Sequence, residues 1–419
     1  MMMIKEDLWK QPQPQENKIL RELDEENAGK IGPIPTFFTL LKGFIAAGVL
    51  FLPKGFYTGG WGFTSGALFF SCLLTIFSSV KLIQIRQKYK LSFSEIGEKA
   101  YGLPGKIAVD FFLAFTQTIF VCAYIAFIVG SVDNISQAHF GTGPINPWYA
   151  GIGCFLIYTP LCWVRKIEKF AFFHIFADVA IAIGLIVIVV YGSKEVANNG
   201  FSDDSQFFNS KTFLSVIGLA AYTFEGIGIV IPVMETTSRP DLYPYILSGV
   251  IVLVTFIYLF FGNWMYFSFG RERIGENPLI TDALPPKDIA VTIVEIIWII
   301  NLIFTYPLVL HPANMVFESY AFPNMSKGIA RRWAKNFTRT LTVAFTVVLS
   351  IALEDTLDKL ESINGAMACI PLAFLLPCLF HYKLIAETSR EKIIDLSISV
   401  LSFVLMIACS TITFITWNE

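Results

Sequence analysis

Long apolar stretches recur along this chain, and they constrain its fold more than any other feature. A segment of about 20 mostly apolar residues is long enough to cross a bilayer as a helix. The alternating pattern of a membrane barrel is absent, so we expect helices. The sequence therefore predicts an all-α integral membrane protein with eleven transmembrane helices. The eleven apolar runs are 36–58, 62–85, 107–133, 147–164, 168–192, 212–234, 244–269, 288–311, 338–356, 360–382 and 394–416.

The composition agrees with this class. Hydrophobic residues make up 54% of the chain and charged residues only 15%, whereas a soluble domain carries about 25% charge. The net charge of −2 gives no field that would favour nucleic acid.

Motifs for chemistry or for a cofactor are absent from the sequence. No metal-ligand spacing, nucleotide-binding loop or nucleophile pattern is present, so we expect no enzyme, no metal and no cofactor. The cysteines lie within apolar runs and are expected to behave as small buried hydrophobes. They are Cys72, Cys122, Cys154, Cys162, Cys369, Cys378 and Cys409.

Residues 1–35 form a polar segment that is expected to be a retained cytosolic tail. With this tail in the cytosol, 22 Lys and Arg residues fall in cytosolic segments and 7 in segments on the other side. This bias predicts a cytosolic N-terminus and an odd number of spans. Residues 36–416 form the transmembrane domain.

Two apolar runs combine glycine and proline in a similar order. The first contains Gly48-Val-Leu-Phe-Leu-Pro53, and the sixth contains Gly228-Ile-Val-Ile-Pro232. Interrupted helices at matching positions of two opposed halves indicate a transporter built from inverted repeats. We therefore predict a 5+5 inverted repeat with broken helices 1 and 6, whose irregular segments lie around 46–48 and 225–228. The first repeat is 36–192, the second is 212–382, and 394–416 is an extra helix.

A helix that breaks within the bilayer leaves backbone groups unpaired, which is tolerated only where they line a cavity or a site. The start of a half-helix offers N–H groups to an anion, and its end offers carbonyls to a cation. This arrangement suits the carboxylate and ammonium of an amino acid. The alternative is that the small residues only allow close helix packing. The predicted substrate contacts are Phe44, Ile45, Ala46, Ala47, Gly48, Val49, Leu50, Thr223, Phe224, Gly226 and Gly228.

An acid, Glu225, lies within the sixth run, where a carboxylate costs about 3 kcal/mol or more. It is a candidate proton carrier, a protonated brace for the broken helices, or a partner for a base or the substrate ammonium. We favour the brace, with proton coupling next. No Lys or Arg is expected in a neighbouring helix core, so a static salt bridge ranks last. Glu295, in the eighth run, is the second proton-coupling candidate.

Other polar residues receive structural interpretations. Ser92 and Glu95 have the spacing of a capping box before a short cytoplasmic helix. Asp178 is expected to make a buried hydrogen bond rather than to couple an ion. The acids between the ninth and tenth runs, Glu354, Asp355, Asp358 and Glu361, are expected to form a solvated face.

Several motifs together resemble the amino acid/auxin permease family, in particular its proton-assisted amino acid transporters. That family belongs to the amino acid–polyamine–organocation superfamily. The resemblance extends through most of residues 36–382. The matching motifs are LKGFIAAGVLFLP (41–53), SFSEIGEKAYGLPGK (92–106), YTPLCWVRKIEKFAFFHIFAD (158–178), FEGIGIVIPVME (224–235), TYPLVLHPA (305–313) and INGAMACIPLAFLLPCLFHY (363–382).

The chain departs from the family pattern in its first span. Phe44 stands where the family commonly has Asn, and Ala46-Ala47 stand where it commonly has Gly-Thr. Phe44 removes a polar side chain of the kind that sodium-coupled relatives use, so we expect no sodium requirement.

The resemblance implies a secondary transporter of small neutral amino acids, proton-coupled and working by alternating access. The expected partners are an amino acid, protons and the lipid bilayer of a plasma, vacuolar or lysosomal membrane. The alternative, motivated by the same departures, is a transport-degenerate protein of this fold. It would act as a sensor or as a structural subunit beside membrane-protein partners.

Overall fold

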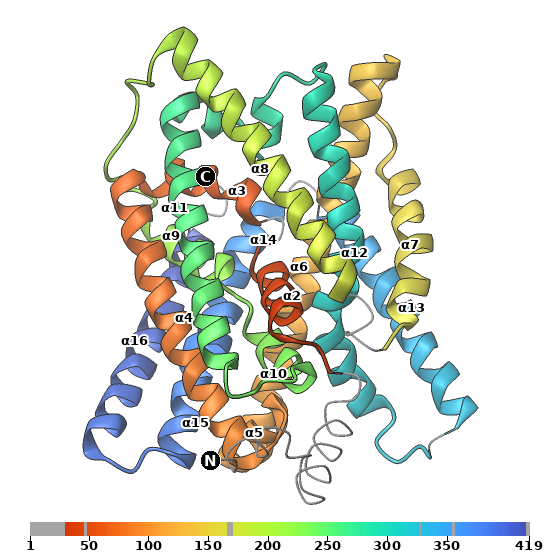
Figure 1. The fold of residues 1–419 in the computed structure, drawn as a ribbon, viewed down its shortest axis with the longest axis vertical. Coiled ribbons are helices and arrows are strands. Elements are labelled where there is room, and N and C mark those ends of the chain that lie inside the picture. The colour runs from red at the N-terminus through yellow and green to blue at the C-terminus, as the bar shows by residue number, and fades with distance from the viewer. Residues whose placement is uncertain are drawn as a thin grey trace, which may run out of the picture.

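The computed structural model of this chain describes residues 30–45, 48–165, 171–277, 279–326, 328–353 and 357–415. The side chains at 171–174, 176 and 357–360 lie outside that description. The described part is a bundle of helices, most of which run along the long axis of the molecule (Figure 1). The expectation of an all-α membrane protein is confirmed in this respect.

The helices follow one another with short connections. In chain order they are α2 (Pro33–Phe44), α3 (Gly48–Gly59), α4 (Trp61–Tyr89), α5 (Phe93–Tyr101), α6 (Leu103–Phe140), α7 (Pro147–Trp163), α8 (Ala171–Asn199), α9 (Phe213–Thr223), α10 (Ile227–Thr236), α11 (Tyr243–Glu276), η2 (Ile280–Ala283), α12 (Ile289–Ala321), α13 (Ile329–Ala352), α14 (Leu357–Asn364), the π-helical turns η4 (Gly365–Cys369) and η5 (Pro371–Leu375), α15 (Leu376–Leu384) and α16 (Ser389–Ile415).

In the part of the chain that the structure describes, each predicted apolar run falls on a helix, on a broken pair or, for the run 360–382, on the consecutive elements α14, η4, η5 and α15. Within the described residues, eight helices are long and apolar enough to cross a membrane, or nine if the bent pair α2–α3 is one span. The runs 147–164 and 338–356 fall on α7 and α13, which do not meet this test of length and composition. The count of eleven spans and the 5+5 repeat stay predictions.

The central helices are held by an apolar core. α6 and α12 pack against each other, α8 packs on α12, and α11 packs on α2, α3 and α4. All seven cysteines are unpaired and buried, as expected for small hydrophobes. The apolar faces of α7, α8 and α16 that point outward are consistent with a lipid environment.

The predicted capping box is present at the start of α5. The Ser92 side chain accepts a hydrogen bond from the Glu95 amide, and the Glu95 carboxylate accepts one from the Ser92 amide at 2.8 Å. These bonds hold the pKa of Glu95 below its usual value. α5 lies at the end of the bundle where α13 and α16 also begin, at the bottom of Figure 1. We call it the basic end, because it also carries Arg331, Arg332 and Lys335 in the first turns of α13.

α9 and the π-helical turn η4 cross at two glycines. A Cβ added at Gly365 would lie 2.1 Å from the carbonyl oxygen of Gly218, which is far inside van der Waals contact. The crossing therefore depends on the absence of a side chain at position 365.

We expect Gly365→Ala to lower the thermal stability of the purified protein by about 1–3 kcal/mol, because the two backbones must separate. Gly153→Ala on α7 is the control, since a Cβ there meets nothing within 4 Å. Thermal unfolding in detergent compares the two variants. Equal melting temperatures would show that the helices do not cross this closely.

Candidate functional site

The first span breaks near its middle, as the glycine and proline pattern predicts. α2 ends at Phe44, and Ile45 has extended backbone angles, φ −98° and ψ 93°. Ala46 and Ala47, two of the predicted contacts, lie outside the described residues. α3 begins at Gly48, and the two helices are bent by 46° relative to each other.

The sixth span breaks one to two residues earlier than predicted. We expected the irregular segment at 225–228, but α9 ends at Thr223 and α10 begins at Ile227, so residues 224–226 are non-helical. Gly228 lies inside α10, and its predicted place in the break is wrong. Pro232 lies inside α10 and Pro53 inside α3. Because proline lacks an N–H, each leaves a carbonyl of its helix without the usual partner.

The two breaks touch each other. A Cβ added at Gly226 would lie 2.6 Å from two ring carbons of Phe44, so the Phe44 ring packs directly on the Gly226 backbone. The Phe44 carbonyl, left free at the end of α2, accepts a hydrogen bond from the Tyr258 hydroxyl at 2.6 Å. Tyr258 comes from α11, so α11 supports the first break from one side.

A small cavity of about 20 Å³ lies where the breaks meet. That volume holds about one water molecule. A molecule larger than water therefore fits only if Phe44 or its neighbours move. The cavity is lined by Gly43, Phe44, Gly48, Gln117, Phe120, Tyr124, Tyr222, Thr223, Glu225, Gly226, Ile229, Tyr258 and Val309.

The Glu225 carboxyl borders this cavity and is buried. Its Oε2 accepts a hydrogen bond from the Gln117 amide nitrogen at 3.2 Å, and the backbone of Gly228 lies beside it. Its Oε1 has no partner among the described residues. The carboxyl thus has one bonded oxygen and one oxygen free for a further hydrogen bond.

The other predicted contacts divide into two groups. Phe44, Gly48, Thr223 and Gly226 line the cavity, and their contact with a substrate stays a prediction. The others do not line it: Ile45, Val49, Leu50 and Phe224 are buried in the surrounding core, and Gly228 sits against Leu113 and Gln117.

Aromatic and polar side chains that the sequence did not single out complete the site. Tyr222 stacks on Phe120 with ring centroids 4.5 Å apart, and its hydroxyl donates to Glu361 Oε1 at 3.1 Å. The expectation that Glu361 belongs to a solvated face is therefore wrong, because it is buried against α9. Gln117 could have been noticed as an amide in the middle of a long apolar run.

A second buried charged site lies on the other side of α2. Lys42 is fully buried, and its nearest opposite charge is Asp178 on α8. The Lys42 Nζ and both Asp178 oxygens have no hydrogen-bond partner among the described residues. Two expectations are corrected here. Asp178 makes no hydrogen bond to the described residues, and a lysine does lie in the core of a helix that neighbours Glu225.

Glu295 lies in the second turn of α12, far along the chain from Lys42, Asp178 and Glu225. Its carboxyl is buried beside Asn134 and the carboxyl of Asp282. This places it at the end opposite the basic end, among residues of α6 and η2. The structure does not bring it together with Glu225.

The chain resembles known transporters over nearly all of its length. Residues 29–415 match the family described as transmembrane amino acid transporter protein. Vacuolar amino acid transporter 3 of Saccharomyces cerevisiae is 32% identical over 93% of this chain and 57% of its own length. The plant amino acid transporter AVT3A of Arabidopsis thaliana is 29% identical over 88% of this chain and 85% of its own length.

The chain spans little more than half the length of the yeast relatives that it matches. Among solved structures, a Na⁺-coupled sialic acid symporter in a substrate-bound, outward-open state has a TM-score of 0.59. It covers 94% of this chain at 13% sequence identity, so the likeness concerns the fold alone.

The contact between Phe44 and Gly226 gives a test of this geometry. We expect Gly226→Ala to lower the melting temperature, because the new Cβ collides with a ring that is buried and cannot move freely. Adding Phe44→Leu should recover part of the loss, since leucine removes the colliding ring.

A double-mutant cycle of the two substitutions, followed by thermal unfolding, measures this coupling. Additive effects would mean that the two breaks are not in contact.

Proposed function

This chain belongs to the transmembrane amino acid transporter family, and we propose that it is a proton-coupled secondary transporter of small neutral amino acids. The observation that carries the proposal is the meeting of two helix breaks at one cavity beside the buried Glu225. Transport would proceed by alternating access, in which the broken helices move against the helices packed around them.

The substrate would bind through its backbone charges. The start of α10, at Ile227, directs the positive end of the helix dipole toward the break, which favours a carboxylate. The substrate ammonium would reach the carbonyls at the end of α2 and the free oxygen of Glu225. Both requirements are those of a zwitterion.

The apolar and aromatic lining favours a small side chain. Phe44 fills most of the space above Gly226, and Tyr222, Phe120 and Tyr258 close the remaining sides. Glycine, alanine and proline would need only a small displacement of Phe44, whereas leucine or tryptophan would need the ring to leave.

Two buried acids are candidates for proton coupling. Glu225 is already held by Gln117, which suits the role of a brace between the two breaks. Asp178 has no hydrogen-bond partner among the described residues, and its charge interacts with that of Lys42 on α2. A proton that enters this pair changes its net charge within the membrane, and a charge there is costly. We therefore assign the coupling proton to the Lys42–Asp178 pair and the brace to Glu225.

The membrane that we propose is the vacuolar one, on the basis of the names of the fungal relatives. The basic end would face the cytosol, because it carries the excess of Lys and Arg residues.

Purified protein in liposomes tests the transport activity. We expect alanine to accumulate when the pH gradient drives protons in the same direction as the substrate. Glycine and proline should compete with this uptake, and the uptake should need no sodium. Replacing sodium with choline at constant pH is the ion control. Better competition by leucine or tryptophan than by glycine would contradict the proposed size limit, and uptake that stops in choline would contradict the absence of a sodium requirement.

Phe44→Ala extends the same assay. It should let leucine compete, because the ring no longer fills the cavity, whereas Phe256→Ala on the exposed face of α11 should not. Amino acid binding without flux in the wild-type protein would favour the second candidate, a sensor or structural subunit. The observation behind that candidate is the small cavity filled by Phe44.

Neutral variants distinguish the proposed roles of Asp178 and Glu225. We expect Asp178→Asn to lose accumulation driven by pH while keeping the exchange of labelled for unlabelled alanine, because the substrate site stays intact. Glu225→Gln should keep both activities, since it preserves the shape and hydrogen bonding of the side chain.

Glu225→Ala should lose both activities together with thermal stability. Loss of pH-driven accumulation in Glu225→Gln, with exchange retained, would instead make Glu225 the proton carrier. An Asp178→Asn protein that accumulates alanine normally would remove Asp178 from the coupling step.

A further inference from the structure

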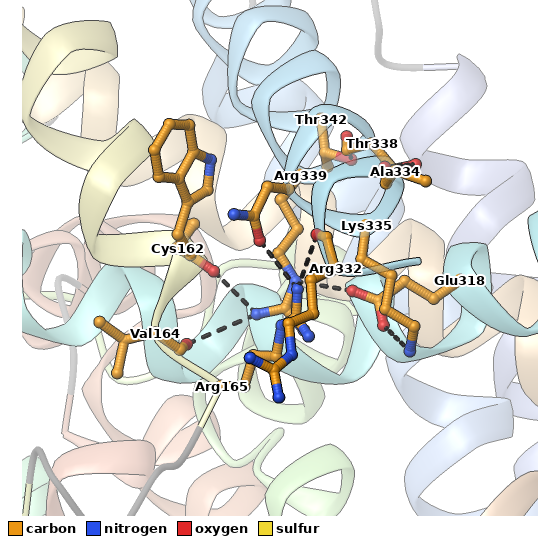
Figure 2. A network of polar contacts seen from close by, with 12 residues as sticks. Cys162, Val164, Arg165, Glu318, Arg332, Ala334, Lys335, Thr338, Arg339 and Thr342 are labelled. Carbon is orange, nitrogen blue, oxygen red and sulfur yellow. Dashed lines mark hydrogen bonds and ion pairs between the residues drawn. The ribbon is translucent and has the colours of Figure 1, made fainter. Parts of the chain in front are cut away.

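A pocket lined by positive side chains opens at the basic end, between the end of α7 and the start of α13. Its volume is about 540 Å³. Figure 2 shows the surrounding network, with α13 above and the α7 connection at the left. We call it the basic pocket; its lining residues are Arg165, Gly328, Arg331, Arg332 and Lys335.

Glu318, an acid beside this pocket, already has a cationic partner for each of its carboxylate oxygens. Glu318 on α12 pairs with Lys335 at 2.5 Å and with the buried Arg339 at 2.6 Å (Figure 2). Arg339 also donates to the Cys162 carbonyl at 2.7 Å. This network is closed, because each Glu318 oxygen has one cationic partner.

Three arginines of the pocket remain without an acidic partner in the described part of the chain. Arg165 donates only to neutral oxygens, the Arg332 carbonyl at 2.8 Å and the Asn336 side chain at 2.9 Å. The Arg331 Nε is buried and has no partner there. Partial burial and, after it, the positive charge of Arg339 hold the pKa of Arg165 below its usual value. Several positive charges therefore line the basic pocket.

A general excess of positive residues on the cytosolic side explains their number but not this convergence. Arginine forks match phosphate oxygens in bidentate geometry, and an anion with two negative charges would relieve the mutual repulsion of the guanidinium groups.

An apolar stripe leads away from the pocket along the outer face of α13. Ile329, Trp333 and Phe337 follow one another at helical spacing and are 74%, 62% and 65% exposed. Trp333 meets Trp163 of α7 edge to face at 6.0 Å. Exposed tryptophans mark the depth of the lipid headgroups, and an exposed apolar stripe beyond them lies at the depth of acyl chains. The ligand of this pocket therefore has a charged head and an apolar tail.

We propose that the basic pocket binds the phosphomonoester headgroup of an anionic membrane lipid, whose acyl chains lie along the apolar stripe of α13. The headgroup contacts Arg165, Arg331 and Arg332, while the Glu318–Arg339 network keeps α7, α12 and α13 in place behind them. Basic pockets between helices at the cytosolic side of a membrane are suited to such headgroups. This site is independent of the transport function.

Native mass spectrometry of the full chain in detergent, titrated with dioleoyl phosphatidic acid, tests the proposal. We expect one molecule to bind at least tenfold more tightly than dioleoyl phosphatidylcholine. The double variant R331A/R332A should lose this preference but keep the wild-type melting temperature, because neither side chain belongs to the Glu318 network.

The matched control is R390A/K392A, which removes two exposed positive charges from the start of α16 at the same end of the bundle. It should keep the preference. The proposal is overturned if phosphatidic acid binds no more tightly than phosphatidylcholine, or if both double variants lose binding equally. Displacement by glycerol phosphate at the same concentration as the lipid would also overturn it, by making the ligand a soluble anion.

Discussion

The hydrogen bond from the Tyr258 hydroxyl to the Phe44 carbonyl is the interaction on which the central site depends. A broken helix in hydrocarbon exposes backbone groups that water cannot satisfy. α11 supplies the partner for the end of α2, and it supplies a second tyrosine, Tyr243, whose hydroxyl donates to Val230 of α10 at 2.6 Å. One helix thus holds segments of both broken spans, because it bonds the carbonyl at the end of α2 and a carbonyl within α10.

The buried charges of the protein follow two different patterns. At the basic end, Glu318, Lys335 and Arg339 satisfy one another, and the Arg339 guanidinium also reaches the end of α7. Near the breaks, Glu225, Lys42 and Asp178 keep atoms without partners in the described structure. A fully bonded network resists motion, because removing any partner leaves a charge exposed to a low dielectric. Charges beside broken helices that have no partner among the described residues can instead gain and lose partners, as the coupled transport proposed above would require.

How much of the structure the sequence predicts depends on how far apart in the chain the interacting residues lie. The apolar runs and the capping box at Ser92 are local patterns, and both were recovered. The break in the sixth span was foreseen but misplaced, because glycine at 228 is compatible with a helix and the helix had already ended at Thr223. Glu361 was misread because it follows other acids in the sequence, while its actual neighbour, Tyr222, is 139 positions away. Lys42 was overlooked as a core charge for the same reason, since Asp178 is distant in the chain.

The sequence by itself determined the class of the protein and the location of its irregular backbone. Hydrocarbon accepts only segments whose backbone bonds are internal, so length and apolar composition are sufficient to predict helices, and glycine with proline is sufficient to weaken them. Only the tertiary structure decided what faces those weak points. The placement of the Phe44 ring on Gly226, the bond from Gln117 to Glu225, and the convergence of Arg165 with Arg331 and Arg332 each join distant segments. Such contacts depend on how helices pack, and a pattern along one chain segment holds no information about the partner that packing brings to it.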